Sequence, residues 1–329
     1  MSNKVGRRTF MKNSAASTIA AVSLGAVHEA WSTPRPAADS DKSVKGMPRG
    51  KIGKVEISRM ICGSNPFYGG AHSRDLIYVS KLLEQYCTQE KIFDTLELCE
   101  KSGINTMIEG ESLSVRYRKE RGGNLQGLAM IMLEGENVMT GRTLIDTTQK
   151  AIDNGVVGAF IRGAEADRWV RTNKLDLIEK FLAHVRKNGL IAGVGAHDIR
   201  VPVACERAGL IPDFHFKTFH HDRYYSALPK EKRKPFLVDS WGPDDHDCIW
   251  EQYPDETIEF MKTVKTPWIA FKVLAAGAIR PEEGFRYAFQ HGADFLAVGM
   301  LDFWVKQNVE IANQILYDPT IQNRNRQWA

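Results

Sequence analysis

The stretch "WIAFKVLAAGAIRPEEGFRYAFQHGADFLAVGM" (residues 268–300) contains two short apolar runs separated by a helical pattern. The runs at 268–277 and 294–300 are largely apolar without strict alternation, as in parallel strands that helices cover on both faces. Between them, apolar residues recur at three-and-four spacing and stop at Gly292, directly after a histidine, which is typical of a helix end. The stretch therefore predicts a strand, a helix and a second strand.

The same unit recurs along the chain from residue 59 onward. Helical patterns such as 143–155 and 174–189 alternate with apolar runs, which lie at 59–67, 105–110, 128–135, 157–163, 191–198, 213–219, 268–277 and 294–300. Eight strands with their helices in about 270 residues match a single-domain (β/α)8 TIM barrel, here with a long loop between the sixth and seventh strands. An open doubly wound sheet is the alternative, but no G-x-G-x-x-G follows the first strand, where a Rossmann fold needs it.

The composition suits an enzyme-sized globular protein: 329 residues, 43% hydrophobic and 26% charged. Of the net charge of +4, the first 30 residues contribute +3, because four basic residues there oppose one glutamate. The remainder is close to neutral, so nothing indicates a nucleic-acid partner. No segment reaches the roughly 20 apolar residues of a membrane-spanning helix.

The N-terminal segment "GRRTFMKNSAASTIAAVSLGAV" pairs Arg7 with Arg8 and continues into an Ala/Ser-rich apolar run. It resembles a twin-arginine (Tat) export signal, and a short basic helix is the alternative. The resemblance implies a periplasmic or otherwise exported protein that uses the Tat machinery and does not insert into the membrane after export. We assign residues 1–30 to the signal, 31–50 to a linker, 51–318 to the barrel and 319–329 to a C-terminal tail.

Barrel enzymes place their chemistry at the C-terminal ends of the strands and in the loops that follow. Polar side chains of this chain gather at those positions. They are Ser64, Asn65, Glu109, Glu111, Glu134, Glu136, Arg162, His197, Asp198, Lys217, His220, His221, Lys272 and Asp302. We therefore expect a site at the mouth of the barrel.

Lys272 lies in an otherwise apolar run, where partial desolvation would lower its pKa and free an amine for imine formation or proton transfer. Alternatively, its charge pairs with Glu109 or Glu134 and only orients the substrate. Lys217 has the same character on the neighbouring strand, and like-charge repulsion could lower both pKa values. A register error of one residue would turn Lys217 out of the barrel. The candidate catalytic residues are Lys272, Lys217, Glu109, Glu134 and His197.

The segments "DFHFKTF" (213–219) and "AFKVLAAGAIRPEEGFRYAFQHGADFLAVGM" (270–300) resemble strands six to eight of class I aldolases of the deoxyribose-phosphate type. The resemblance implies that Lys217 forms a Schiff base and that Lys272 tunes it. The fourth strand, "AFIRG", has no matching acidic partner.

A longer resemblance connects 51–70, 96–112 and 186–198 with the opening and the fifth-strand region of aldo-keto reductases. Their hydride-transfer tetrad is not recognisable, because Glu109 stands where that family has Asp and Arg162 where it has His. This resemblance implies the barrel and, as an alternative function, an NAD(P)-dependent oxidoreductase. The cofactor's phosphates would need basic residues near the last two strands, where Arg280 and Arg286 are available.

A divalent metal is a third possibility, since Glu134, His197 and His220 offer carboxylate and imidazole ligands at strand ends. The alternative is that each histidine is an ordinary hydrogen-bonding group. The loop after the sixth strand is long enough to cover a substrate, and its aromatic residues could stack on a sugar. The predicted substrate-binding residues are Asn65, Arg162, His220, His221, Tyr224 and Trp241.

These observations predict an exported TIM-barrel enzyme for a small carbonyl or carbohydrate substrate. The expected chemistry is an aldol-type, isomerase or lyase reaction centred on Lys272. A nicotinamide-dependent oxidoreductase and a non-catalytic sugar-binding barrel are the alternatives.

Overall fold

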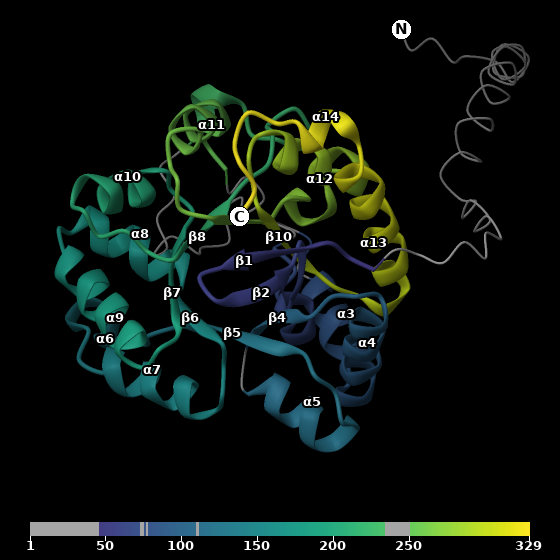
Figure 1. Cartoon of the computed structure of the whole chain (residues 1–329), viewed down its shortest axis with the longest axis horizontal. Coiled ribbons are helices and arrows are strands. Elements are labelled where there is room, and N and C mark those ends of the chain that lie inside the picture. The colour runs from purple at the N-terminus through teal and green to yellow at the C-terminus, as the bar shows by residue number, and fades with distance from the viewer. Residues whose placement is uncertain (1–45, 73–75, 77, 110–111, 234–250) are drawn as a thin grey trace, which may run out of the picture. The chain divides into compact units, whose positions relative to one another are not determined.

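Eight parallel strands close into a barrel in the computed structural model of the chain (Figure 1). Around the barrel they are β3 (Met60–Gly63), β4 (Thr106–Glu109), β5 (Gln126–Ile131), β6 (Gly158–Ile161), β7 (Ile191–Ala196), β8 (Phe214–Thr218), β9 (Trp268–Phe271) and β10 (Phe295–Gly299), which pairs with β3. Each falls within, or within two residues of, a predicted run, so the (β/α)8 barrel is confirmed. The structure describes residues 46–72, 76, 78–109, 112–233 and 251–329. The predicted export signal, residues 31–45 of the linker and Trp241 lie outside these ranges.

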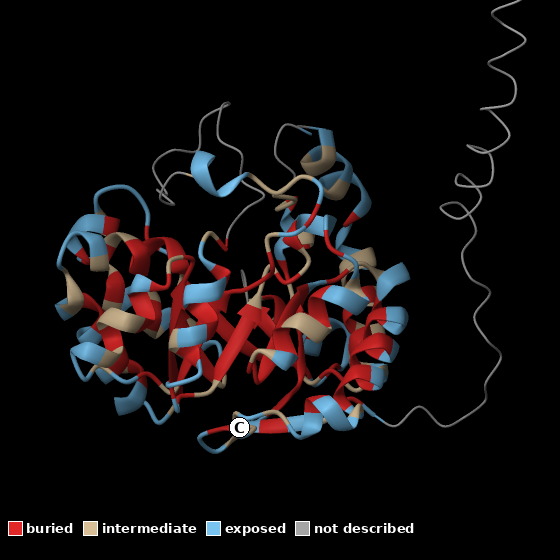
Figure 2. Cartoon of the chain, turned by 90° about the horizontal axis from the view of Figure 1, so that it is seen from above, coloured by how far each residue is buried: buried red, intermediate tan, exposed pale blue. Residues whose placement is uncertain are grey.

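Helices surround the barrel, with the buried strands inside and exposed faces outside (Figure 2). They are α3 (Tyr78–Tyr86), α4 (Gln89–Lys101), α5 (Leu113–Arg121), α6 (Asn137–Thr140), α7 (Leu144–Asp153), α8 (Gly163–Arg171), α9 (Leu175–Lys187), α10 (Arg200–Arg207), α11 (Pro254–Met261), α12 (Pro281–Gln290), α13 (Asp302–Leu316) and α14 (Pro319–Gln322). Three 3-10 turns are η1 (Asn65–Tyr68), η2 (Lys230–Lys232) and η3 (Ala275–Gly277). The periodicity of α9 shows why it forms: Leu177, Ile178, Phe181, Leu182 and Val185 are its buried face. Among the described residues, no helix is long and apolar enough to span a membrane.

The barrel interior is filled by large apolar side chains. Phe216 stacks between Phe160 and Phe271, with ring centroids 4.4 Å apart in both pairs. Phe214 belongs to the same interior cluster. Because side chains alternate along a strand, the inward Phe214 and Phe216 turn His215 and Lys217 outward, toward the helices.

A hairpin of β1 (Arg49–Ile52) and β2 (Val55–Ser58) precedes the first barrel strand. Ile52 and Ile57 are fully buried in the interior cluster, so the hairpin plugs the barrel at the end opposite the mouth. Strand β1 begins two residues before the predicted start of the barrel.

The predicted C-terminal tail is packed against the barrel. Arg324 and Arg326 both bind the buried carboxylate of Asp294, at 2.7 and 2.6 Å. Trp328 packs beneath the guanidinium of Arg324, 3.4 Å from the ring centroid. The segment from 319 to 329 therefore contributes to the structure.

Candidate active site

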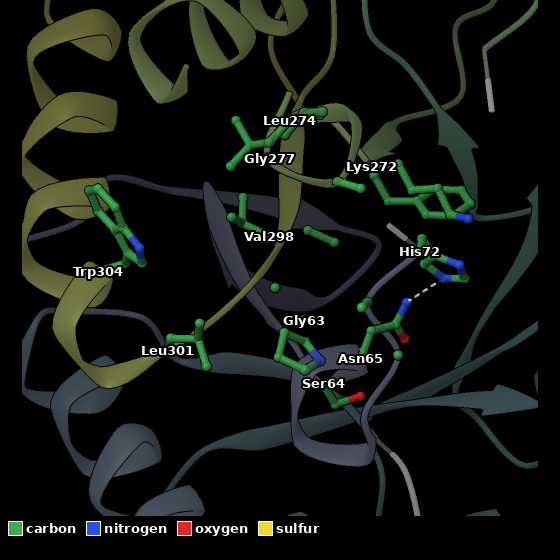
Figure 3. Close-up of a pocket in the computed structure, with 18 of the residues that line it drawn as sticks. Gly63, Ser64, Asn65, His72, Lys272, Leu274, Gly277, Val298, Leu301 and Trp304 are labelled. Carbon is green, nitrogen blue, oxygen red and sulfur yellow. Dashed lines mark hydrogen bonds between the residues drawn. The ribbon is translucent and has the colours of Figure 1, made fainter. Parts of the chain in front are cut away.

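A pocket of about 610 Å3 opens at the C-terminal ends of β3, β9 and β10. Figure 3 shows Lys272 and His72 at one end of it and Trp304 at the other, with Gly63 and Val298 between them. Most of the lining side chains are apolar. The pocket lies at the barrel mouth, where the sequence places its candidate site.

Lys272 directly follows β9 and has a left-handed backbone with φ of 56°. This conformation is costly for a residue other than glycine and occurs mostly where the surrounding structure enforces it, often at functional sites. The turn continues through Ala275 and Ala276, which also have positive φ. The half-buried side chain of Lys272 lines the pocket, so this candidate catalytic residue reaches the mouth.

His197 follows β7 and forms a buried pair with Asp167 of α8. Its Nδ1 lies 2.8 Å from the Asp167 carboxylate, which also accepts the backbone N–H groups of His197 and Asp198. Burial lowers the pKa of His197 well below its usual value, and the charges of Lys272 and Lys217 lower it further. Burial raises the pKa of Asp167 to about 8, against the backbone donors that lower it. Both shifts favour the uncharged forms of the two side chains.

His197 is next to the pocket rather than in its lining. Its ring meets the edge of Phe271, a pocket-lining residue, with 5.6 Å between centroids. Because Nδ1 is held by Asp167, proton exchange with a bound molecule would use Nε2.

Of the predicted substrate-binding residues that the structure describes, Arg162 and Asn65 stay accessible to solvent. Arg162 makes a two-pronged contact with Glu165, with both N···O distances 2.8 Å, and Glu165 is fully buried. Asn65 lines the pocket, and its Nδ2 lies 3.2 Å from Nε2 of His72, the bond drawn in Figure 3. Glu165 thus already balances the charge of Arg162, whereas Asn65 and His72 face the pocket.

The alternative role predicted for Lys272 pairs its charge with Glu109 or Glu134. Glu109 is the last residue of β4, and its side chain is outside the described set. Glu134 is exposed in the loop after β5 and is not among the residues that line the pocket.

Lys217, a candidate catalytic residue whose direction the sequence left open, points away from the barrel interior. Its amine is buried outside the strands and contacts Glu251 at 2.6 Å. It also donates to the backbone oxygens of His197 and Thr218 and to the Thr218 hydroxyl. Lys217 therefore anchors the backbone of His197, and the structure gives it no access to the pocket.

His220, His221 and Tyr224 are also engaged within the protein. His220 uses Nδ1 toward the backbone oxygen of His221, and its Nε2 accepts the backbone N–H of Glu251. Nε2 of His221 lies 2.9 Å from the Glu283 carboxylate. Tyr224 packs on Ala275 and Ile279, beneath the turn that follows Lys272. These three residues support the loops around the site instead of lining the pocket.

The predicted metal ligands Glu134, His197 and His220 do not converge. Within the described ranges, no group of three or more His, Cys, Asp and Glu side chains is arranged to hold a metal ion. His197 faces Asp167, His220 has both ring nitrogens occupied, and Glu134 is exposed. The donor set therefore does not fit a metal.

The sequence analysis missed His72, Asp167, Glu165 and Glu251 as parts of this region. The signal for two of them was present, because "RGAEAD" (162–167) places three charges where the fourth strand passes into a helix. Of the two basic residues proposed for a cofactor, Arg280 lines the pocket and Arg286 pairs with Asp318 at 2.8 Å.

Comparison with known proteins finds solved structures of the same architecture. Two structures from Pseudomonas aeruginosa, both described as aldo-keto reductases, match with TM-scores of 0.54 and 0.52 and 15% and 16% identity. Each match covers 82% of this chain and 94% of the other. A phospho-2-dehydro-3-deoxyheptonate aldolase from Thermotoga maritima covers 82% of this chain and 73% of its own, at 10% identity and a TM-score of 0.46.

No protein-family model and no curated protein matches the sequence. At these identities the structural likeness defines the fold alone. The chain has the TIM-barrel fold, and its architecture is similar to that of the two structures described as aldo-keto reductases.

Proposed function

We propose that the protein is an enzyme that acts on a carbonyl compound bound at the barrel mouth, with the amine of Lys272 as the reacting group. The observation that carries the proposal is the left-handed backbone of Lys272, which brings its side chain to the lining of the pocket. An amine in such surroundings forms imines with carbonyl substrates more readily than a fully hydrated one.

The His197 and Asp167 pair supplies the proton transfers. When Lys272 Nζ attacks the carbonyl carbon, the nitrogen loses its protons and the carbonyl oxygen leaves as water. The charge of Lys272 acts on His197, so the imidazole lies near the reacting end of the pocket. In an aldol-type, isomerase or lyase reaction, the same imidazole would take or return the proton next to the imine carbon.

Borohydride trapping tests this proposal. The purified full-length protein is incubated with aldehydes and ketones of increasing size, reduced, and weighed by intact mass spectrometry. We expect a substrate-dependent adduct that Lys272→Ala abolishes and Lys217→Ala retains, because the Lys217 amine is buried away from the pocket. Absence of an adduct from the folded wild type would reject imine chemistry.

An NAD(P)-dependent reductase is the second candidate. Lys272 and Arg280 both line the pocket and could face a cofactor's pyrophosphate. Calorimetric titration with NADH and NADPH tests it: we expect binding that weakens in Arg280→Ala if the pocket holds a cofactor, and no heat if it holds only substrate.

Export by the Tat machinery belongs to the same proposal, on the strength of Arg7 and Arg8 followed by an apolar run. Replacing both arginines by lysine should retain the protein in the cytoplasmic fraction. Unchanged distribution between the cell fractions would remove the export hypothesis.

A further inference from the structure

The pocket is larger than a small carbonyl compound needs. About 610 Å3 lies in the middle of the range of sites for molecules of drug size, roughly 300–1,000 Å3. The pocket extends from a reacting end near Lys272 to a far end at Trp304. Val298 and Gly63 lie between the two ends (Figure 3). A bound molecule that fills the pocket therefore extends from the reactive lysine toward α13.

Helix α13 forms the far end with two side chains one turn apart, Trp304 and Asn308. Trp304 is 41% exposed, so part of its indole remains uncovered. Leu301 lies beside this end, and Leu274 lines the pocket near Gly277 (Figure 3). A flat apolar surface between branched aliphatic side chains suits a planar ring, which can stack on the indole.

Asn308 adds a buried polar group to this end of the pocket. It is 3% exposed, and its side-chain oxygen is buried with no hydrogen-bond partner among the described residues. Buried acceptors without a donor are uncommon in proteins, and each calls for an explanation. A ligand whose O–H or N–H group donates a hydrogen bond to this oxygen would supply the missing partner.

We infer that the far end of the pocket is a subsite for an aromatic ring that carries a hydrogen-bond donor, as part of an elongated carbonyl substrate. This inference rests on the proposed function, because it places the carbonyl at Lys272. The substrate class is thus an aryl-substituted aldehyde or ketone with a phenolic hydroxyl or aryl amine distant from the carbonyl.

Calorimetric titration with matched ketones tests the subsite. The probes are phenylalkyl methyl ketones of increasing chain length and their para-hydroxyphenyl counterparts. In the wild type we expect the hydroxylated member of the best-fitting pair to bind about tenfold more tightly, the usual range for one buried hydrogen bond. Asn308→Leu should remove that preference, and Trp304→Ala should weaken both members about tenfold.

Two neighbouring exposed residues of α13 serve as matched controls, because neither lines the pocket. Lys306→Ala and Gln307→Ala should leave both affinities unchanged. If Asn308→Leu fails to fold, the effect of Trp304→Ala, at a partly exposed position, still decides whether the ring binds on α13.

The outcomes separate this inference from the proposed chemistry. The expected binding pattern without a borohydride adduct would support the subsite and reject the imine. An adduct from short aldehydes, with no effect of the ring, the hydroxyl or Trp304, would overturn the subsite and leave the chemistry standing. NADPH binding that requires Trp304 and Asn308, with no binding of the aryl ketones, would assign this end to a cofactor and overturn the inference.

Discussion

Lys217 and Lys272 leave neighbouring strands near the same end of the barrel, yet they occupy opposite environments. Lys217 continues the alternation of β8 to the outside and is fully buried, with three hydrogen bonds to His197 and Thr218 and an ion pair to Glu251. Lys272 lies beyond the end of β9, where a left-handed backbone turns it to the pocket. Burial alone therefore does not bring a lysine of this protein to a ligand pocket; the turn after β9 gives Lys272 that access.

The two regions also differ in polarity. Around Lys217, buried polar groups pair with one another: Glu251 accepts from Lys217, Tyr253 and Thr257, and His220 accepts from Glu251. Around Lys272, most of the pocket wall is apolar. The first region holds loops in place, and the second leaves room for a ligand.

The largest expected effect is on stability at Lys217. Lys217→Met leaves the Glu251 carboxylate buried without its counter-charge, which should cost about 3–5 kcal/mol of unfolding free energy. Lys272→Met, at the partly accessible position, should cost less than about 1 kcal/mol. Urea denaturation of both variants measures the difference. Lys217→Met with Glu251→Gln should recover part of the loss, and equal stability of the two single variants would refute the contrast.

On the Lys217 side, His220 should make the stability depend on pH. Burial lowers the pKa of His220 from 6.5 to about 4, so the unfolded chain takes up the proton first as the pH falls. Its stabilising contribution is present above pH 6.5 and is lost toward pH 4, by roughly 3 kcal/mol. In His220→Gln, the loss of unfolding free energy between pH 6.5 and pH 4 should be smaller than in the wild type by roughly 3 kcal/mol. An unchanged profile would show that His220 is not kept neutral by burial.

Asp167 should act on catalysis by positioning His197. In Asp167→Asn, the side-chain oxygen can still accept the backbone N–H groups, but its amide would donate to His197 Nδ1 and move the ring proton to Nε2. We expect kcat to fall about 10- to 100-fold for loss of a general base. In the wild type, the rate should rise as the pH passes about 8, because the ionised Asp167 makes His197 a stronger base. The variant should lose this inflection; retention of it would assign the titration to another group.

The smallest expected effect is on stability and comes from the backbone strain at Lys272. Glycine adopts a φ of 56° at little cost, whereas alanine is strained there, so Lys272→Gly should be about 1 kcal/mol more stable than Lys272→Ala. Both variants should fail in borohydride trapping. Thermal unfolding of the pair measures the strain, and an alanine variant as stable as the glycine variant would show that the turn relaxes once the lysine is removed.

The architecture was largely predictable from local patterns. The alternation of apolar runs and helical segments from residue 59 predicted all eight barrel strands, because each strand needs a buried run and each helix an apolar face. The position of the site at the mouth followed from the fold, and Lys272, Asn65 and Arg162 are found there. His197 lies beside the pocket, held by a partner that the sequence analysis did not identify.

The sequence by itself determined the barrel, the placement of its polar residues at the strand ends and Lys272 as the principal candidate, since periodicity and strand-end position are local properties. Only the tertiary structure decided which polar residues meet. A strand's register decides the side to which Lys217 points, and pairs such as Asp167 with His197, or Lys217 with Glu251, join residues 30 and 34 positions apart. The turn after β9 likewise needed the packing of Tyr224 on Ala275 and Ile279 to present Lys272 to the pocket.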